Sequence, residues 1–334
     1  MYVTKNPLLV SVTLFALSLP IAPAREKGQD DSAAAGPAVL WSNPTDIASR
    51  NLFYGPGGEQ DQPHGPFTFV KEDMNGTNPK FIVRDRDGVK WTVKLGIEAR
   101  PETVACRITW AVGYYTNEDY FMRDLQVQGM PAHLRRGQKM VDPDGSVHNV
   151  RLKRHDKDET KTADWQWRLD PFTNTRELNG LKVLMAVMNN WDLKNENNHV
   201  YQDGPESIYV VSDLGASFGS AGLRWPLDKA KGNVDSYSHS KFIRRITPTS
   251  VDFAVPARPS FVYLVNPKAY IRRIHLEWIG KGIPRDDARW MGNLLASLSP
   301  GQIHDAFRAA GYTPQEVERF SAIVARRIAM LTDL

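Results

Sequence analysis

The amino-acid sequence of 334 residues predicts a mixed α+β protein, with strands gathered in the first part of the chain and helices in the last part. Three observations lead to this fold class. Short runs rich in β-branched and aromatic residues lie between positions 66 and 95. The segment 174–190 carries apolar residues at three- and four-residue spacing, which is typical of one buried helical face. Beyond position 266, proline and capping residues mark the starts of further helices.

The first 24 residues predict a secretory signal peptide. Lys5 supplies a positive charge, positions 8–19 form an apolar core, and Ala22-Pro23-Ala24 has the small residues of a cleavage site. The apolar stretch is too short and too interrupted for a transmembrane helix. We therefore expect a periplasmic or secreted protein that is not an integral membrane protein after cleavage. Residues 25–39 are polar and Ala-rich, which predicts a flexible lead-in.

The composition is that of a globular protein, with 41% hydrophobic residues and a formal net charge of +4. This small charge, together with the lack of a zinc finger, an aromatic RNA-binding motif or a basic tail, argues against a nucleic-acid partner. The one cysteine, Cys106, excludes an intrachain disulfide, and for an exported protein this fits a bacterial periplasm better than an animal secretory pathway. The chain also lacks the Walker A and H-E-x-x-H motifs.

Residues 40–132 predict a small sheet with one helix. Two strand-like runs, 66–70 and 80–84, flank a loop that contains Gly76, and this loop is either a phosphate-binding turn or an ordinary hairpin turn. Residues 89–95 alternate as a strand does and include Lys94. Pro101 and Glu102 suit the first turn of a helix that stops at Gly113.

Residues 133–170 are rich in basic side chains. The turn Asp142-Pro143-Asp144-Gly145 predicts a hairpin with strands at 137–141 and 146–154. We expect this hairpin to be inserted between the two main parts of the chain. It is either a basic platform for an acidic or phosphorylated partner or simply a solvated hairpin.

The most informative motif follows the helix predicted at 174–188, which Asn174 or Thr175 can cap. The helix leads into Asp192-Leu193-Lys194-Asn195-Glu196-Asn197. A short strand at 208–211 then ends at Asp213-Leu214-Gly215. The order is therefore helix, D-x-K-x-x-N loop, strand and D-L-G.

This order resembles the catalytic loop and the metal loop of the protein-kinase-like superfamily. The usual His-Arg before the aspartate is replaced by Asn190-Trp191. In this respect the chain resembles bacterial persistence-toxin kinases and phosphatidylinositol kinases more than eukaryotic protein kinases. The resemblance implies a two-lobed fold, with a small β-rich N-lobe at 40–132 and a mainly helical C-lobe at 171–334.

The resemblance also implies a role for each residue of the motif. Asp192 would be the catalytic base, and Lys194 would steady the transferring phosphate. Asn197 and Asp213 would hold Mg²⁺ or Mn²⁺.

On the N-terminal side, the resemblance implies a nucleotide site. Lys94 would bind the α- and β-phosphates of ATP and would be held by an ion pair with Glu102. Glu98 remains an alternative partner for Lys94. The loop at Gly76 would stand where a glycine-rich phosphate loop is expected, although it has one glycine and not the G-x-G-x-x-G pattern.

The implied function is an exported, ATP- and metal-dependent phosphotransferase that acts on a hydroxyl of an unknown protein, lipid or small-molecule acceptor. The alternative is a catalytically inactive kinase-like binding module. The presence of all the principal polar residues favours activity, whereas the single glycine of the phosphate loop favours the alternative.

The last third of the chain predicts helices that begin near 266, 284, 300 and 314. Thr313-Pro314-Gln315-Glu316 resembles a capping box and would open the last helix, which runs towards Leu331. We expect Arg319, Arg326 and Arg327 on the solvent side of that helix.

Overall fold

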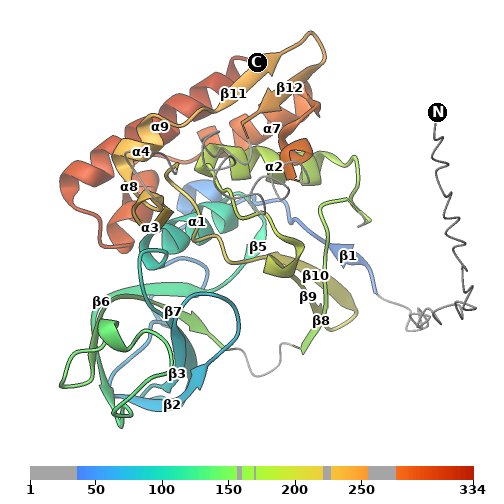
Figure 1. The fold of residues 1–334 in the computed structure, drawn as a ribbon. Coiled ribbons are helices and arrows are strands. Elements are labelled where there is room, and N and C mark those ends of the chain that lie inside the picture. Colours follow the sequence, from blue (N-terminus) through green and yellow to red (C-terminus); the bar gives the residue numbers. More distant parts are fainter. Residues whose placement is uncertain (1–35, 156–159, 169–170, 221–226, 255–275) are drawn as a thin grey trace, which may run out of the picture. The chain divides into compact units, whose positions relative to one another are not determined.

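The computed structural model describes residues 36–155, 160–168, 171–220, 227–254 and 276–334 (Figure 1). The predicted signal peptide at 1–24 lies outside the described residues, as do most of the lead-in at 25–39 and the first part of the helix expected from 266. Within the described ranges, no helix is long and apolar enough to cross a membrane. The mixed α+β fold class is confirmed, and the division into two lobes stays a prediction.

Five strands from the first part of the chain close into a barrel in the order β2-β3-β4-β7-β6. They are β2 (Phe67–Asp73), β3 (Lys80–Arg84), β4 (Lys90–Lys94), β6 (Asp119–Gln128) and β7 (Ser146–Arg154). Because successive side chains of a strand point to opposite faces, alternate residues fill the barrel and the others face outward. The interior is apolar and includes Phe81, Trp91, Val93, Val150 and Leu152.

Strand β7 corrects one prediction made from the sequence. Residues 146–154 do not form a separate inserted hairpin, because β7 pairs with β4 on one side and with β6 on the other. Residues 138–140 form a short 3-10 turn and not a strand. The apolar residues of β7 are buried in the barrel, while the basic residues between them give the segment its polar character in the sequence.

Helix α1 (Ala99–Ala111) lies between the barrel and the helices that follow later in the chain (Figure 1). It contacts β6 and β7 of the barrel and α8 (Pro300–Ala309) of the helical part. Nearly all of its side chains are buried, and buried charges need partners. Arg107 finds them in backbone carbonyl groups, among them those of Phe53 and Asp119 at 3.2 and 2.9 Å.

A second sheet carries the two loops of the sequence motif. Strand β10 (Glu206–Val211) pairs in parallel with β1 (Ala38–Val39) and β5 (Tyr115–Thr116), and antiparallel with β9 (Asn198–Asp203). β8 (Thr160–Asp164) pairs with the other edge of β9. The register places Asn198 opposite Val211, so the β9–β10 hairpin brings Asn197 and Asp213 to the same end of the sheet.

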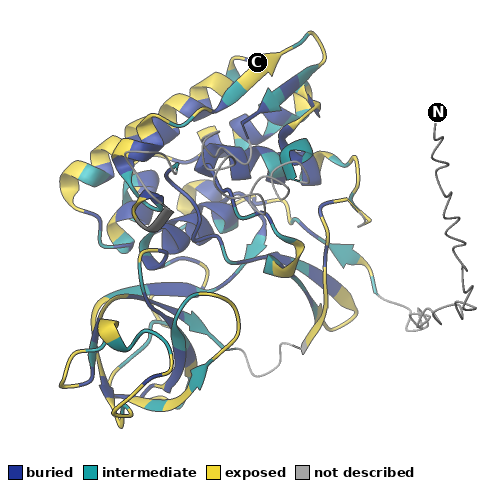
Figure 2. Ribbon diagram, in the orientation of Figure 1, coloured by how far each residue is buried: buried dark blue, intermediate teal, exposed yellow. Residues whose placement is uncertain are grey.

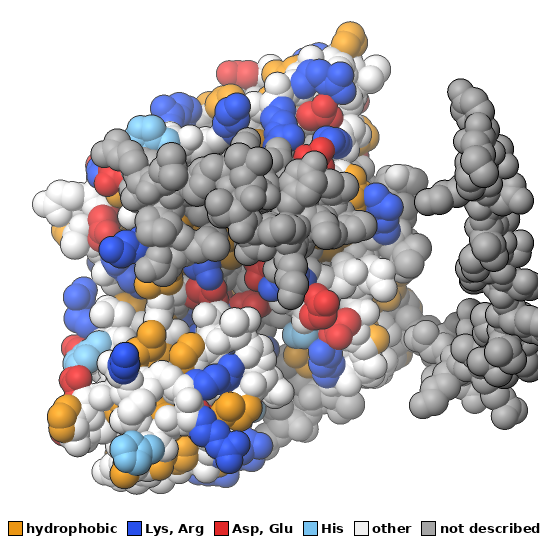
Figure 3. Space-filling view, viewed as in Figure 1, with side chains coloured by type: hydrophobic (Ala, Val, Ile, Leu, Met, Phe, Trp, Pro, Cys, Tyr) orange, Lys and Arg blue, Asp and Glu red, His pale blue; other side chains and the backbone are white. Residues whose placement is uncertain are grey.

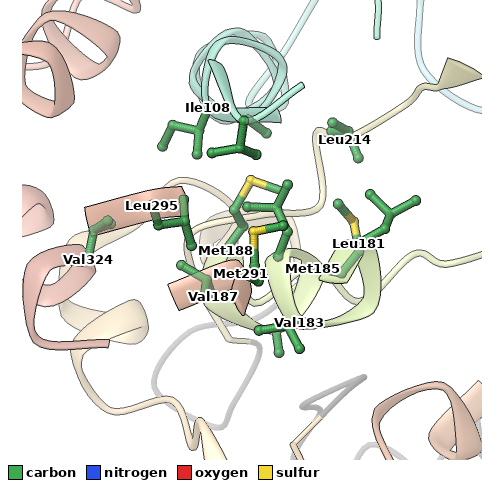
Figure 4. Packing of buried hydrophobic residues seen from close by; sticks show 14 of the residues in the cluster. Ile108, Leu181, Val183, Met185, Val187, Met188, Leu214, Met291, Leu295 and Val324 are labelled. Carbon is green, nitrogen blue, oxygen red and sulfur yellow. The ribbon is translucent and has the colours of Figure 1, made fainter. Parts of the chain in front are cut away.

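Helix α2 (Arg176–Met188) delivers the chain to the first of these loops. The hydroxyl of Thr175 caps it by accepting a hydrogen bond from the Leu178 amide at 3.2 Å. Its apolar side packs against α7 (Arg285–Ala296) and α9 (Pro314–Thr332). Figure 4 shows Met185 and Met188 of α2 meeting Met291 of α7. Figure 2 shows that this buried core continues from α1 through α2 to α7.

The capping box predicted at Thr313 is present at the start of α9, and Ser299 forms a second one at the start of α8. The remaining described elements are short. They are η1 (Ile47–Ser49), η2 (Gln138–Met140), η3 (Asn195–Asn197), η4 (Glu277–Gly280), α3 (Leu227–Ala230), α4 (Val234–Ser238), β11 (Ile243–Ile246), β12 (Ser250–Phe253) and β13 (Ile283–Pro284).

The expected solvent position of Arg327 is wrong. This side chain of α9 is buried, and its guanidinium donates to the carbonyl groups of Ala186 and Val187 at 3.1 and 3.0 Å. It also donates to the Ser240 hydroxyl at 2.6 Å. The last carbonyl groups of a helix have no partner within the helix, so Arg327 satisfies the C-terminal end of α2.

Candidate active site

A cleft of about 1130 Å³ is lined by residues from the barrel, from α1 and from the two motif loops. All seven residues that the sequence predicts for the site line this cleft: Gly76, Lys94, Glu102, Asp192, Lys194, Asn197 and Asp213. Figure 3 shows acidic and basic side chains lying side by side around the hollow next to the barrel. The fold therefore brings together residues that are far apart in the sequence.

Lys94 is the electrostatic centre of the cleft. It is the last residue of β4, it is buried, and its ammonium contacts three carboxylates. Its Nζ lies 2.6 Å from Glu98 Oε2, 2.8 Å from Glu102 Oε2 and 2.6 Å from Asp213 Oδ1. Burial opposes the charged form of Lys94, but the three carboxylates outweigh it and raise the pKa of its ammonium above the usual value. Lys94 is therefore a permanent cation, and both of the glutamates considered as its partner contact it.

Glu102 is fully buried in α1 between two cations. Besides Lys94, it accepts a hydrogen bond at 2.7 Å from the guanidinium of Arg151 on β7. Because Glu102 is held from both sides, it fixes the position of the Lys94 ammonium in the cleft. Arg151 belongs to the basic segment 133–170, and because side chains alternate along β7 it points towards α1, on the opposite face from its neighbours Val150 and Leu152 in the barrel interior.

Asp213 follows β10 with a left-handed backbone, at φ 54°. Asp is one of the few residues with a side chain that tolerates this conformation. Burial alone would raise the pKa of Asp213, but Lys94 lowers it to about 2. The carboxylate is thus ionised at any physiological pH, and its side chain is 41% exposed towards the cleft. An ionised, accessible carboxylate of this kind can bind a hard divalent cation.

The loop from 189 to 197 is held rigidly by its own polar groups. The Asn190 side chain accepts from the Asp192 amide at 2.9 Å, and the Asn197 side chain donates to the Asp192 carbonyl at 2.8 Å. The Ser212 hydroxyl donates to the Asn197 carbonyl at 2.7 Å, which ties the loop to the end of β10. With its Nδ2 used in this way, Asn197 keeps its Oδ1 as an oxygen ligand for a cation.

The carboxylate of Asp192 has two different environments. Its Oδ2 accepts from the ammonium of Lys194 at 2.8 Å. Its Oδ1 is buried and has no hydrogen-bond partner among the described residues. A buried oxygen without a partner is costly, and such groups in native proteins often have a functional reason. Here it is an acceptor without a donor, and rotation of the Asp192 side chain can turn it towards a hydroxyl in the cleft.

Asn190 and Trp191, which stand where protein kinases have His-Arg, anchor the loop that carries Asp192. Trp191 is buried against Ala216 and Ala230, and its amide donates to the Ala216 carbonyl at 3.2 Å. Asn190 is buried as well. This departure from the protein-kinase pattern therefore retains a structural role in holding Asp192.

Gly76 lies in the loop between β2 and β3, with φ +65°. The loop is fastened by Arg136, whose guanidinium donates to the carbonyl groups of Asp73 and Gly76 at 2.6 Å each. At the other end of the loop, Asn78 donates to Glu98 Oε2 at 2.6 Å. Neither Arg136 nor Asn78 was predicted, because no motif spacing links them to Lys94.

The side chain of Lys231, just after α3, is a further residue that the sequence did not predict. It lines the cleft and forms an ion pair with Glu98 Oε1. Within the described ranges, Glu98, Glu102 and Asp213 are a group whose ligand oxygens lie within 4.8 Å of one another. All three oxygens contact the Lys94 ammonium, so this group of carboxylates neutralises the charge of Lys94.

No family model and no curated protein matches the sequence. The fold is similar to that of a Helicobacter pylori proinflammatory kinase, CtkA, with 12% identity over 80% of this chain and 96% of that chain, at a TM-score of 0.46. It is also similar to a Golgi casein kinase, with 9% identity over 85% of this chain and 74% of that chain, at a TM-score of 0.30. Since both TM-scores are below 0.5, the functional interpretation depends on the cleft residues themselves.

Proposed function

We propose that this protein is a kinase-like phosphotransferase that uses ATP and a divalent metal ion. The observation that carries the proposal is the position of Lys94. It lies between Glu102 of α1 and Asp213 of the D-L-G segment, in one cleft with Asp192 and Asn197. A strand lysine, a helix glutamate, a loop aspartate and two metal ligands are the parts that phosphoryl transfer requires.

In the proposed reaction, Lys94 binds the phosphates of ATP and Glu102 orients Lys94. Asp213 and Asn197 hold Mg²⁺ or Mn²⁺ through oxygen atoms, which are the ligands that both ions prefer. The bound ion neutralises charge on the phosphates. The loop at Gly76 covers the phosphates from the barrel side.

Asp192 acts on the acceptor. Once rotation of the side chain turns its unpaired Oδ1 into the cleft, this oxygen accepts the proton of the acceptor hydroxyl while the hydroxyl oxygen forms a bond to the γ-phosphorus. The bond between the γ-phosphorus and the bridging oxygen breaks, and ADP leaves with that oxygen. Lys194, paired with the other oxygen of Asp192, stabilises the negative charge of the transferring phosphoryl group.

We further propose that the barrel with α1 is the N-lobe and that α2 and α7 to α9 form the C-lobe. The predicted signal peptide at 1–24 would place the enzyme in the periplasm or outside the cell. The acceptor would then be a protein, a lipid or a small molecule met there.

The second candidate function is a catalytically inactive binding module of the same superfamily. One observation favours it, namely that all three donors of the Lys94 ammonium already face carboxylates. A nucleotide must displace one of them before it can bind Lys94.

The test uses the mature protein beginning at Arg25. Thermal unfolding is followed with ATP alone, with ATP and Mg²⁺, and with ATP and Mn²⁺, because a ligand that binds only the folded state raises the melting temperature. Transfer of the γ-phosphate to the protein and to candidate acceptors is then measured. Binding with transfer supports the enzyme, binding without transfer supports the module, and no binding with either metal contradicts the enzyme and leaves the module as the better account.

A further inference from the structure

The carboxylate of Glu98 is surrounded by three nitrogen donors from three different segments. Its Oε2 accepts from Asn78 Nδ2 and from Lys94 Nζ, each at 2.6 Å, and its Oε1 accepts from the ammonium of Lys231. Asn78 belongs to the loop before β3, Lys94 ends β4, and Lys231 follows α3. All of these residues line the cleft. We call Asn78, Lys94 and Lys231 the anion cradle.

The anion cradle directs two ammonium groups and one amide at the single carboxylate of Glu98. Lys94 is shared with Glu102 and Asp213, and Lys231 adds a second positive charge on the other oxygen of Glu98. Charged donors that converge in this way bind phosphate well, since a phosphate offers several oxygens and more than one negative charge. Burial opposes ionisation of Glu98, yet Lys94 and Lys231 outweigh burial and lower the pKa of its carboxyl. The cradle thus stabilises a negative charge even though the group that carries this charge is almost completely buried.

Of the carboxylates around Lys94, Glu98 is the one that can leave. Glu102 is held by Arg151 as well, and Asp213 is the metal ligand of the proposed function. The backbone of Glu98 is fixed by close packing, because a Cβ placed on Gly215 would lie 2.6 Å from the Glu98 Cβ. The carboxylate beyond that Cβ can still move by rotation about the side-chain torsions.

We propose that the anion cradle of Asn78, Lys94 and Lys231 is a phosphate-binding site that the Glu98 carboxylate occupies in this structure, and that an incoming phosphate group displaces it. The inference rests on the proposed function in one respect only, namely that the phosphate group belongs to a nucleoside triphosphate. It adds Asn78 and Lys231 as phosphate-binding residues and makes Glu98 an internal competitor.

The test measures the affinity of the mature protein for tripolyphosphate in the presence of Mg²⁺ by calorimetry. Glu98→Gln keeps the shape and removes the competing charge, and we expect binding about tenfold tighter than in the wild type, since a like charge at contact distance is removed. Glu196→Gln removes the same charge from an exposed part of the same cleft lining, and we expect less than about a twofold change because solvent screens it.

The role of Lys231 is tested in the Glu98→Gln background. There, Lys231→Gln is expected to reverse the gain, whereas Lys161→Gln, a lysine of the same cleft that faces Asp164, is expected to leave it in place. Melting temperatures verify that each variant is folded. Equal affinity of the wild type and Glu98→Gln, no effect of Lys231→Gln, or no binding to any variant would each overturn the proposal.

Tripolyphosphate carries no nucleoside and tests the cradle separately from the enzyme. If the expected pattern appears while ATP is neither bound nor used, the cradle stands and the proposed function fails. If the wild type transfers phosphate from ATP while Glu98 and Lys231 have no effect on tripolyphosphate, only the cradle fails.

Discussion

Replacing Lys94 by Met tests whether the cleft is organised around one buried cation. In the wild type, three cations (Lys94, Arg151 and Lys231) contact three carboxylates (Glu98, Glu102 and Asp213), and Arg151 also faces the buried Asp119 at 3.5 Å. The substitution removes one positive charge and leaves excess negative charge in a mostly buried cluster. Breaking a buried ion pair from one side costs about 3–5 kcal/mol. Two cations remain and the side chain of Asp213 is 41% exposed, so we expect the lower end, a loss of about 3 kcal/mol in the free energy of unfolding near pH 8.

The loss should depend on pH with a definite sign. In the wild type, the pKa of Glu98 is lowered and that of Asp213 is lowered to about 2. Their contribution to stability is therefore fully present above the unfolded values near 4 and is lost as pH falls through the folded-state values. Between pH 5 and 8 this contribution is constant. In Lys94→Met, the excess charge raises a carboxyl pKa in the folded state, so the folded protein binds a proton and loses stability as pH rises.

The assay is urea unfolding of both proteins at pH 5 and at pH 8. We expect the deficit of Lys94→Met to be smaller at pH 5 by at least about 1 kcal/mol, because the protonated carboxyl no longer contributes to the excess charge. Lys161→Met is the control, since Lys161 forms an exposed pair with Asp164, and it should change stability by less than about 0.5 kcal/mol at both pH values. A deficit that is equal at the two pH values, or no larger than that of the control, would refute the reasoning.

Three other predictions concern chemistry and packing. Asp213→Ala should abolish metal-dependent ATP binding in calorimetry, whereas Asp192→Ala should change affinity less than about threefold and lower turnover by about 10²–10⁴; equal losses of affinity in both variants would contradict the assigned roles. Gly215→Ala should destabilise the fold by about 1–3 kcal/mol in urea unfolding, because its Cβ would lie 2.6 Å from that of Glu98, and an unchanged midpoint would show that the contact yields freely. Arg327→Met should cost about 1–3 kcal/mol and also slow turnover, because it removes the buried guanidinium that donates to the carbonyl groups of Ala186 and Val187 alongside the Asn189 amide and the Tyr237 hydroxyl, just before the Asp192 loop; a variant as stable as the wild type would mean that the remaining donors suffice.

The parts of the site that the sequence predicts are those set by local rules. The helix cap at Thr175, the D-x-K-x-x-N loop and the strand before Asp213 follow each other within 40 residues, and each has its own local signal. Lys94 and Glu102 were found because a strand alternation is followed by a Pro-Glu helix start. The structure brings these two groups to 2.8 Å, but their roles in nucleotide binding stay predictions.

The parts that the sequence does not predict depend on contacts between distant segments. β7 was assigned to a hairpin because local turn signals cannot show that its two edges pair with β4 and β6. Arg151 and Lys231 reach the cleft, and Arg136 reaches the loop at Gly76, only after the barrel closes and α3 is in place. The sequence predicts Arg327 on the solvent side because helical periodicity shows only on which side of the helix a residue lies. It cannot show that the carbonyl groups at the end of α2 lie opposite that side.

The closure of the barrel limits how the loop around Gly76 can move. The strands on either side of this loop, β2 and β3, pair with each other up to Asp73 and Lys80, and each also pairs with another strand of the barrel. The two strands are held differently: β3 pairs with β4 along its whole length, up to Lys80 and Lys94, whereas β2 pairs with β6 only at Phe67 and Thr68, at the end away from the loop. Bending of the loop over a ligand would therefore break backbone hydrogen bonds on the β3 side, so motion is easier on the β2 side and in the six residues between the strands.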